Sequence, residues 1–126
     1  MPNDVITIHA ITKELSELLV GGRIEKIYQP EQDEITLFIK NQRKIYPLVI
    51  SANASNPRVH VTSQKKENSL NAPAFCMLLR KYLISGIINR VEIFNSDRIV
   101  RIDVLSRNEL NDLTEYCLMV ELMGRY

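Results

Sequence analysis

The stretch VEIFNSDRIVRIDVL, residues 91–105, decides the fold. Apolar residues alternate with their neighbours on both sides of Asn95-Ser96-Asp97, which is the two-residue period of a β-strand. Asn and Asp tolerate the positive φ angles that tight turns require. The pattern therefore predicts a β-hairpin with Asp97 and Arg98 at its tip. A turn can hold these two side chains outward as a binding site, or they can simply cap the turn and be hydrated.

Two helices are predicted outside this hairpin. Residues 4–20 carry apolar side chains at helical spacing, and Gly21-Gly22 ends the helix because glycine enters the left-handed conformation without a Cβ clash. Its predicted buried residues are Ile8, Ile11, Leu15 and Leu18. Residues 73–84 form the second helix, which Gly86 ends. The predicted buried stripe of that helix is Phe75, Leu78, Leu79, Tyr82 and Leu83, with Arg80 and Lys81 outside it.

Further strands are predicted on both sides of the second helix. Residues 23–28 form a strand that Gln29-Pro30 ends, and residues 34–50 form a second hairpin. Pro47 in that hairpin indicates an edge strand or a bulge, because proline cannot donate to the ladder. Short strands are also expected at residues 57–61 and 117–122. Strands and helices do not alternate as crossover units would, and no internal repeat is evident. The predicted fold class is therefore α+β with antiparallel sheets.

Length, charge, cysteine content and hydropathy limit the kinds of protein that this chain can be. A chain of 126 residues can form one domain with a substantial core. Sixteen basic and fifteen acidic residues leave a net charge of +1, so nucleic-acid binding would need a local patch. Cys76 and Cys117 lack the close partners of a zinc site and are expected to be free and buried. No apolar run could cross a membrane and no secretory signal is visible, so we expect a cytoplasmic protein. The abrupt stop after a strand pattern indicates a part of a larger protein.

Chemistry-bearing motifs are few. The sequence has no glycine-rich phosphate loop, paired-histidine metal motif or nucleophile elbow, so we expect no metal and no cofactor. His9 lies beside the apolar face of the first helix and is expected to be a half-buried packing residue.

A few cations are candidates for contact with nucleic acid. Arg58 and His60 have the same parity on one predicted strand, so they point to one face. Arg98, Arg107 and Arg125 lie in or beside turns and strand ends, where a planar guanidinium could contact phosphate oxygens. A hydrated protein surface explains the same residues equally well.

Six blocks of sequence resemble the N-terminal domain of the NFACT family, which includes bacterial RqcH proteins. The blocks are LLVGGRIEKIYQP (18–30), NPRVHVT (56–62), FCMLLRKYL (75–83), SDRIV (96–100), SRNELNDL (106–113) and VELMGRY (120–126). They follow the family's order over nearly the whole chain. The resemblance identifies residues 1–126 as an NFACT N-terminal domain, a truncated part of a larger multidomain protein.

The resemblance implies a role in ribosome-associated quality control. Family members bind large ribosomal subunits obstructed by peptidyl-tRNA and recruit alanyl-tRNA, so that an alanine tail is added to the stalled chain without mRNA. The family's Asp-Arg pair matches Asp97 and Arg98, and a second stretch linked to tRNA binding matches Glu121, Leu122 and Met123. Bond formation would belong to the ribosome, so the resemblance implies a binding module and not an enzyme.

Two alternatives come from the same resemblance. The family's older name, fibronectin-binding protein A, implies a surface adhesin. The family is also similar in fold to the N-terminal domain of formamidopyrimidine-DNA glycosylases, a β-sandwich flanked by helices, in which an N-terminal proline is followed by glutamate. Pro2 could form a Schiff base, but Asn3 stands where that glutamate is expected and cannot transfer a proton.

Overall fold

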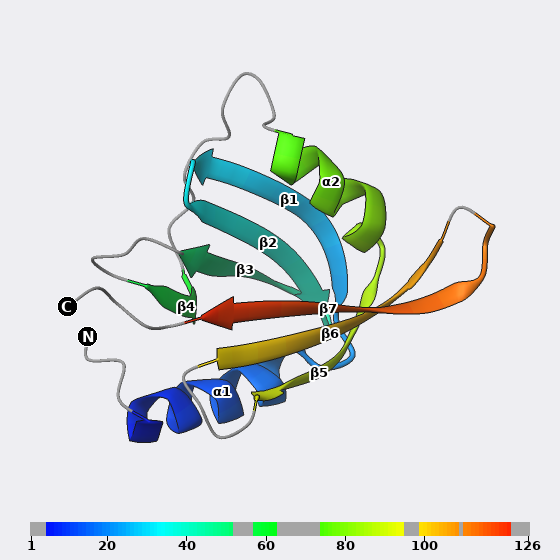
Figure 1. Ribbon diagram of the computed structural model, residues 1–126. Helices are drawn as coiled ribbons and strands as arrows, with labels where there is room; N and C mark the ends of the chain where they lie inside the picture. The colour runs from blue at the N-terminus through cyan, green and yellow to red at the C-terminus, as the bar shows by residue number, and fades with distance from the viewer. Residues whose placement is uncertain (1–4, 52–56, 63–73, 95–98, 109, 122–126) are drawn as a thin grey trace.

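The computed structural model describes residues 5–51, 57–62, 74–94, 99–108 and 110–121 (Figure 1). Two helices and seven strands lie within these ranges. In chain order they are α1 (Val5–Leu19), β1 (Arg23–Glu31), β2 (Glu34–Asn41), β3 (Lys44–Ser51), β4 (Arg58–Val61), α2 (Ala74–Leu83), β5 (Ile87–Ile93), β6 (Ile99–Arg107) and β7 (Leu113–Glu121).

The strands form one antiparallel sheet in the order β4-β3-β2-β1-β5-β6-β7. β1 and β5 pair only at Arg23 and Ile87, so the sheet has two arms, β1–β4 and β5–β7. Figure 1 shows the second arm passing in front of the first, and a single hydrophobic core takes side chains from both. The predicted α+β class and antiparallel pairing are confirmed. The predicted sandwich-like sheets are not separate, because they are two arms of one continuous sheet.

The two arms repeat one arrangement around the residue pair that joins them. Ile24 N donates to the Gly86 carbonyl at 2.9 Å, and in the reciprocal bond Ile88 N donates to the Gly22 carbonyl at 2.8 Å. A register shift follows one residue later in each of β1 and β5. A two-fold rotation about an axis through the junction would exchange these two hydrogen bonds, so the two arms are related by an approximate two-fold axis.

The two helices are related by the same approximate two-fold axis. α1 packs on β5 and α2 packs on β1, so each helix covers the first strand of the other arm. Leu19 and Leu83 are buried at equivalent positions near the helix ends, and two residues later Gly21 and Ser85 both have positive φ, 91° and 67°. The prediction that the chain has no repeat is therefore wrong. The repeat escapes a reading of the sequence because only the helix ends, LLVGGRI and YLISGII, retain a shared pattern.

α2 buries a different face from the predicted one. Its buried side chains are Cys76, Leu79 and Leu83. Phe75 and Leu78, both expected in the core, are 48% and 50% exposed. Arg80, expected outside the stripe, is half-buried, and its Nε donates to the Ile27 carbonyl at 2.9 Å. Apolar residues occupy two faces of this helix, so spacing alone did not identify the face that meets the sheet.

α1 agrees better with its prediction. Its buried residues after residue 7 are Ile8, Thr12, Leu15 and Leu19, with Ile11 and Leu18 packed at the edge of the core. His9 is exposed and not half-buried, because this face runs through Ile8 and Thr12. Neither helix in the described ranges has the length and apolar composition that a bilayer crossing requires.

Three strand details differ from expectation. β1 continues through Gln29-Pro30, because a register shift after Tyr28 accommodates the proline. β7 begins at Leu113 and not at residue 117. Cys117 is exposed because it alternates outward on β7, whereas Cys76 is buried as predicted.

Pro47 lies where β4 ends beside β3. The Pro47 carbonyl accepts a hydrogen bond from Thr62 N at 2.9 Å, directly beyond the Leu48–Val61 pair. The N–H and C=O of one strand residue point the same way, so the missing N–H of Pro47 costs no bond to β2. The prediction of an edge strand or a bulge at Pro47 is wrong, because β3 lies between β2 and β4 and its register with β2 is unbroken at Pro47. The proline fits because β4 ends at Val61 and needs no N–H from it.

Candidate functional site

The hairpin predicted from residues 91–105 is formed by β5 and β6. Phe94 N donates to the Ile99 carbonyl at 2.9 Å at the end where the chain turns. Asp97 and Arg98 lie outside the described residues, so their outward display at the tip stays a prediction. In the sequence, Arg98 directly precedes Ile99, the first residue of β6.

β7 ends beside the beginning of β6. Ile99 and Glu121 are cross-strand partners, and Glu121 is exposed. Leu122, Met123 and Arg125 follow but lie outside the described residues. The pairing therefore brings together the two strand ends from which the candidate stretches, residues 97–98 and 121–123, continue.

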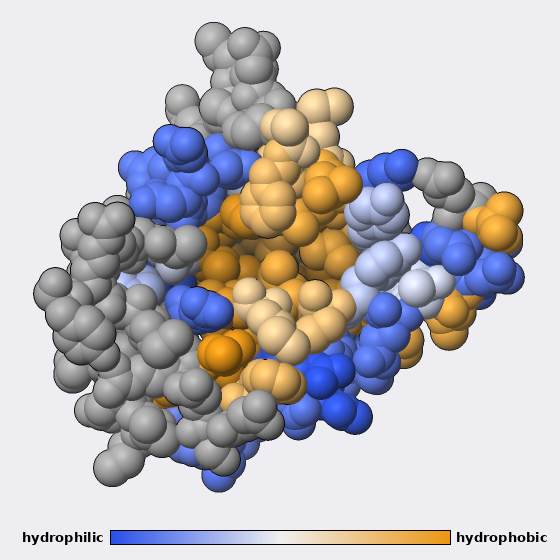
Figure 2. Space-filling model, in the orientation of Figure 1, coloured by the Kyte–Doolittle hydropathy of each residue, from blue (hydrophilic) through white to orange (hydrophobic). Residues whose placement is uncertain are grey.

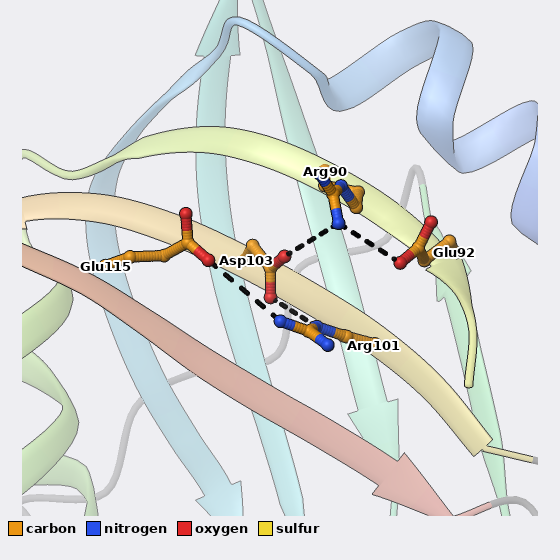
Figure 3. Close-up of polar contacts among 5 residues, drawn as sticks. All are labelled: Arg90, Glu92, Arg101, Asp103 and Glu115. Carbon is orange, nitrogen blue, oxygen red and sulfur yellow. Dashed lines mark hydrogen bonds and ion pairs between the residues drawn. The ribbon is translucent and has the colours of Figure 1, made fainter. Parts of the chain in front are cut away.

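A buried carboxylate lies farther along β6 (Figure 3). The Asp103 side chain has no exposed surface, and its Oδ1 accepts a hydrogen bond from Arg101 Nε at 2.8 Å. Its Oδ2 is 4.0 Å from Arg90 Nη1 on β5 and has no hydrogen-bond partner among the described residues. Asp103 thus lies between two guanidinium groups but is hydrogen-bonded to one of them only.

Two further acids extend this network. Arg90 Nη1 lies 3.5 Å from Glu92 Oε1, and Arg101 Nη2 lies 4.0 Å from Glu115 Oε1 on β7. These contacts join three neighbouring strands on the face opposite the core, because charged and core residues alternate along β6.

Asp103 also affects the proton equilibria of its neighbours. Its hydrogen bond raises the pKa of the Arg101 guanidinium, which stays charged. Cys117 is the cross-strand partner of Asp103. The pKa of the Cys117 thiol is raised, mainly because the thiol loses hydration and to a smaller extent because the Asp103 carboxylate is close. A protonated thiol is a weak nucleophile and a poor metal ligand. In the described part of the chain, no three His, Cys, Asp or Glu side chains gather as a metal site would require.

Arg58 and His60 point to one face of β4, as predicted. Arg58 Nε donates to His60 Nε2 at 3.1 Å, and Arg58 Nη2 forms an ion pair with Glu34 Oε1 at 3.1 Å. The Glu34 side chain is only 3% exposed. Arg58 therefore compensates a buried carboxylate, and any contact with nucleic acid, which stays a prediction, would compete with that pair.

Arg107 lies at the far end of β6 from Ile99. Over a strand of this length the separation is on the order of 25 Å. Arg107 Nη1 donates to the Asn111 carbonyl at 3.0 Å and so supports the β6–β7 turn. Of the described candidates, only Glu121 lies next to the hairpin end of β6, whereas Arg58 and His60 lie on the strand at the other end of the sheet order.

An open groove of about 480 Å³ runs between α1 and the end of β5 that leads to the hairpin tip. His9 and Lys13 line it from α1, and Glu92 lines it from β5. His9 therefore faces solvent near the hairpin, a position that the expectation of a packing residue missed.

The Arg101–Asp103 pair was also missed in the sequence, although a signal exists. Residues two apart on a strand share a face, so opposite charges at this spacing indicate a pair. The full burial of Asp103 depends on β5 and β7 and cannot be seen in the sequence of β6. Pro2 and Asn3, the residues behind the glycosylase alternative, lie outside the described residues.

Comparison with known proteins covers the whole chain. Residues 4–126 match the family model described as NFACT N-terminal and middle domains. Over 126 residues the chain is 42% identical to a protein of Bacillus subtilis named Rqc2 homolog RqcH, and 37% identical to one of the same name from Streptococcus pneumoniae. The matches cover 100% of this chain but 22% and 23% of those proteins, so the chain spans less than a quarter of their length.

Solved structures agree with the sequence matches. The N-terminal domain of the fibronectin-binding protein PavA from Streptococcus pneumoniae has a TM-score of 0.94 and 38% identity, over 98% of this chain and 46% of that chain. The N-terminal part of the fibronectin/fibrinogen-binding protein of Streptococcus suis has a TM-score of 0.93 and 37% identity, over 98% and 46%. A fibrinogen-binding protein from Staphylococcus aureus has a TM-score of 0.88 and 28% identity, over 98% and 44%.

Proposed function

Because the chain belongs to the NFACT family, we propose that it is the tRNA- and large-subunit-binding module of a ribosome-associated quality control factor. The factor acts in the cytoplasm on large subunits that hold peptidyl-tRNA, and it supports alanine tailing of the stalled chain by recruiting alanyl-tRNA. Residues 1–126 are one part of that larger protein. The module binds and positions RNA, and peptide-bond formation belongs to the ribosome.

One observation carries this proposal. The Ile99–Glu121 pairing makes neighbours of the strand ends that lead to Asp97-Arg98 and to Leu122-Met123. Two stretches separated in the sequence can therefore contribute to one surface. The groove between α1 and β5 approaches the same end of the hairpin and adds the cation Lys13.

The residue types suit an RNA partner. Arg98 can pair with a phosphate through its planar guanidinium or stack on an unpaired base. Asp97 and Glu121 can accept hydrogen bonds from base amines or a 2′-OH, which distinguishes RNA from DNA. A net charge of only +1 supplies little nonspecific attraction, so binding depends on these individual contacts.

Sequencing of the RNA that co-purifies with the protein from cells tests the proposal. We expect enrichment of tRNA, which the double variant Asp97→Ala/Arg98→Ala loses while the melting temperature stays nearly constant. Glu25→Ala/Lys26→Ala, which removes an adjacent exposed acid and base on β1, is the matched control and should retain the RNA. A tip variant that loses stability but still binds tRNA would make the pair structural and would contradict the proposal.

A second candidate function is adhesion to fibronectin, because two of the solved relatives are described as fibronectin-binding or fibronectin/fibrinogen-binding proteins. Detection of the native protein on unlysed cells, together with saturable binding to immobilised fibronectin, would favour this candidate over RNA binding. The glycosylase alternative has a separate test. A borohydride-trapped adduct with abasic-site DNA that disappears in Pro2→Ala would identify an enzyme. The fold similarity to glycosylases stays a prediction.

A further inference from the structure

Positive charge gathers at one end of the first arm. Exposed cations lie where β1 begins, where β2 ends and in the turn between β2 and β3, and together they form a basic patch: Arg23, Lys26, Lys40, Arg43 and Lys44. In the described part of the chain, no acid forms an ion pair with any of them. Arg23 lies directly opposite Lys40 in the sheet, a pairing of like charges that destabilises a fold. The basic patch is therefore better explained by an anionic partner than by the stability of the sheet.

A groove of about 230 Å³ opens beside the basic patch. Its lining comes from three neighbouring strands: Glu25, Lys26, Tyr28, Phe38, Lys40 and Ile45. The rings of Tyr28 and Phe38 meet edge to face, with centroids 5.0 Å apart, and Ile45 is 55% exposed. Pockets for whole small molecules usually enclose about 300–1,000 Å³. The groove thus suits one flat ring of a larger molecule, with positive charge at its rim.

The second arm provides an internal comparison, because the approximate two-fold axis relates its outer face to this one. Counted from Gly22 and Gly86 and then across the paired strands, the equivalent residues are Tyr28 and Glu92, Phe38 and Asp103, and Ile45 and Glu115. The three acids of the second arm pair with Arg90 or Arg101, so that face neutralises its own charge (Figure 3). In the first arm an apolar residue replaces each acid. The fold accepts either set, so the apolar groove and its unpaired cations are not required for folding.

The basic patch is separate from the other surfaces of interest. Arg23 pairs with Ile87 at the start of β5, whereas the hairpin tip follows Ile93, on the order of 20 Å farther along that strand. Figure 2 shows the side that carries α2, where an apolar area lies between α2 and β7 with polar surface beside it. α2 covers the core face of β1, while Tyr28 alternates to the opposite face. A ligand on the basic patch would therefore leave the hairpin tip free.

We propose that the basic patch and its groove bind an unpaired segment of the ribosomal RNA of the large subunit. This inference rests on the proposed function and names the surface that meets the subunit. One base enters the groove against Tyr28 and Ile45, and adjacent phosphates pair with Lys40 and Lys44. Aromatic rings that stack on bases, beside cations that follow the backbone, are the usual means of binding single-stranded RNA. RNA carries one negative charge for each flat ring, which an acidic polypeptide does not, so the groove and its rim together favour RNA.

Site-specific cross-linking tests the contact directly. The photoreactive residue p-benzoylphenylalanine replaces either Ile45 or the equivalent Glu115 in the full-length protein, which is then irradiated on large subunits that hold peptidyl-tRNA. Both positions are exposed, at 55% and 46%, so they differ in arm and not in access to solvent. We expect position 45 to cross-link to ribosomal RNA at least about tenfold more than position 115, with the linked nucleotide in an unpaired segment as sequencing would show.

Charge variants provide a second, independent measurement. Lys40→Ala/Lys44→Ala in the full-length protein should weaken binding to large subunits by about tenfold and reduce the salt dependence by about one unit of slope for each lysine. Lys40→Arg/Lys44→Arg keeps both charges and should stay within about twofold of the unchanged protein. Tyr28→Leu should weaken binding and Tyr28→Phe should not, because phenylalanine retains the ring. Affinity for free tRNA should be the same in all four variants.

The outcomes separate this inference from the function on which it rests. If the unchanged protein binds large subunits and Lys40→Ala/Lys44→Ala binds them equally well, the inference is overturned and the proposed function stands. If the unchanged protein does not bind them, both are overturned. Cross-links from position 45 to tRNA or only to protein would also overturn the inference, as would loss of tRNA binding in the lysine variant. The cross-linking result decides the matter if Tyr28→Leu lowers the melting temperature.

Discussion

Arg101 Nε donates to Asp103 Oδ1 at 2.8 Å, while the other oxygen of this buried carboxylate has no hydrogen-bond partner among the described residues. The two residues therefore differ in what their removal leaves behind. Arg101→Met leaves a buried carboxylate without its donor, whereas Asp103→Asn leaves guanidinium groups that water can reach. We expect Arg101→Met to lower the free energy of unfolding more than Asp103→Asn does, as urea denaturation at pH 7 would measure. A larger loss of free energy of unfolding in Asp103→Asn than in Arg101→Met would contradict this prediction.

Gly86 occupies a place where the junction between the arms leaves no room for a side chain. A Cβ there would lie 2.5 Å from Val104 Cγ1 and 2.9 Å from the Leu83 carbonyl oxygen. Because one of these neighbours is backbone, Gly86→Ala should lower the free energy of unfolding by about 1–3 kcal/mol in denaturant titrations. Gly22→Ala, at the equivalent place in the other arm, should have a cost of similar size. A cost below about 0.5 kcal/mol at both positions would show that the junction adapts.

Ser85 is the counterpart of Gly21 and has a φ of 67°, a conformation that L side chains rarely adopt. Ser85→Gly should therefore raise the free energy of unfolding by about 0.5–1 kcal/mol. Gly21→Ala should lower it by about 1 kcal/mol, although no atom lies within 4 Å of the added Cβ. Thermal unfolding of the two variants tests the strain at these positions, since a side chain is removed from a positive-φ residue in one variant and added to one in the other. Loss of stability in Ser85→Gly would contradict the strain assigned to Ser85.

The parts of the fold that the sequence predicts are those with one dominant pattern. Apolar and polar residues alternate over much of residues 91–94 and 99–105, and these residues pair as β5 and β6, as predicted. α2 lacks a single pattern, because one apolar face meets β1 and another is exposed, so its buried residues were mispredicted. The repeat was missed for a different reason. The two halves share backbone hydrogen bonds at Gly22 and Gly86, and different side chains can accompany the same backbone bonds.

The candidate site was predicted less completely than the fold. Spacing alone points to Asp97-Arg98 as a turn, but their proximity to the Glu121 stretch depends on the β6–β7 register, which the sequence of one strand does not contain. Arg58 and His60 do share a face, yet the ion pair between Arg58 and Glu34 joins β4 to a strand two places away in the sheet. Contacts between strands distant in the sequence are the part that period-based reasoning cannot supply.

Cys117 should be slow to react near neutral pH. Loss of hydration and the Asp103 carboxylate raise its thiol pKa, so the thiolate forms only above the pH at which an ordinary cysteine ionises, about 8.5. The rate of alkylation by iodoacetamide should therefore rise with a midpoint above that of a free thiol. Asp103→Asn should move the midpoint down, because it removes a negative charge that opposes ionisation. Cys76 is buried and should stay unlabelled in the folded protein, which makes it the internal control.

Glu121 distinguishes specific tRNA recognition from general attraction to phosphate. It is exposed, and its partner Ile99 directly follows the candidate Asp97-Arg98 pair in the sequence. If its carboxylate accepts hydrogen bonds from RNA or orients Arg98, Glu121→Lys should weaken tRNA binding by about tenfold, although the added positive charge alone would strengthen it. Titration of labelled tRNA at several salt concentrations measures both effects. The control is Glu25→Ala/Lys26→Ala, an exposed pair on β1, which should leave the affinity within about twofold. Tighter binding by Glu121→Lys, with a steeper salt dependence, would show that Glu121 only stands near the phosphates and takes no part in recognition.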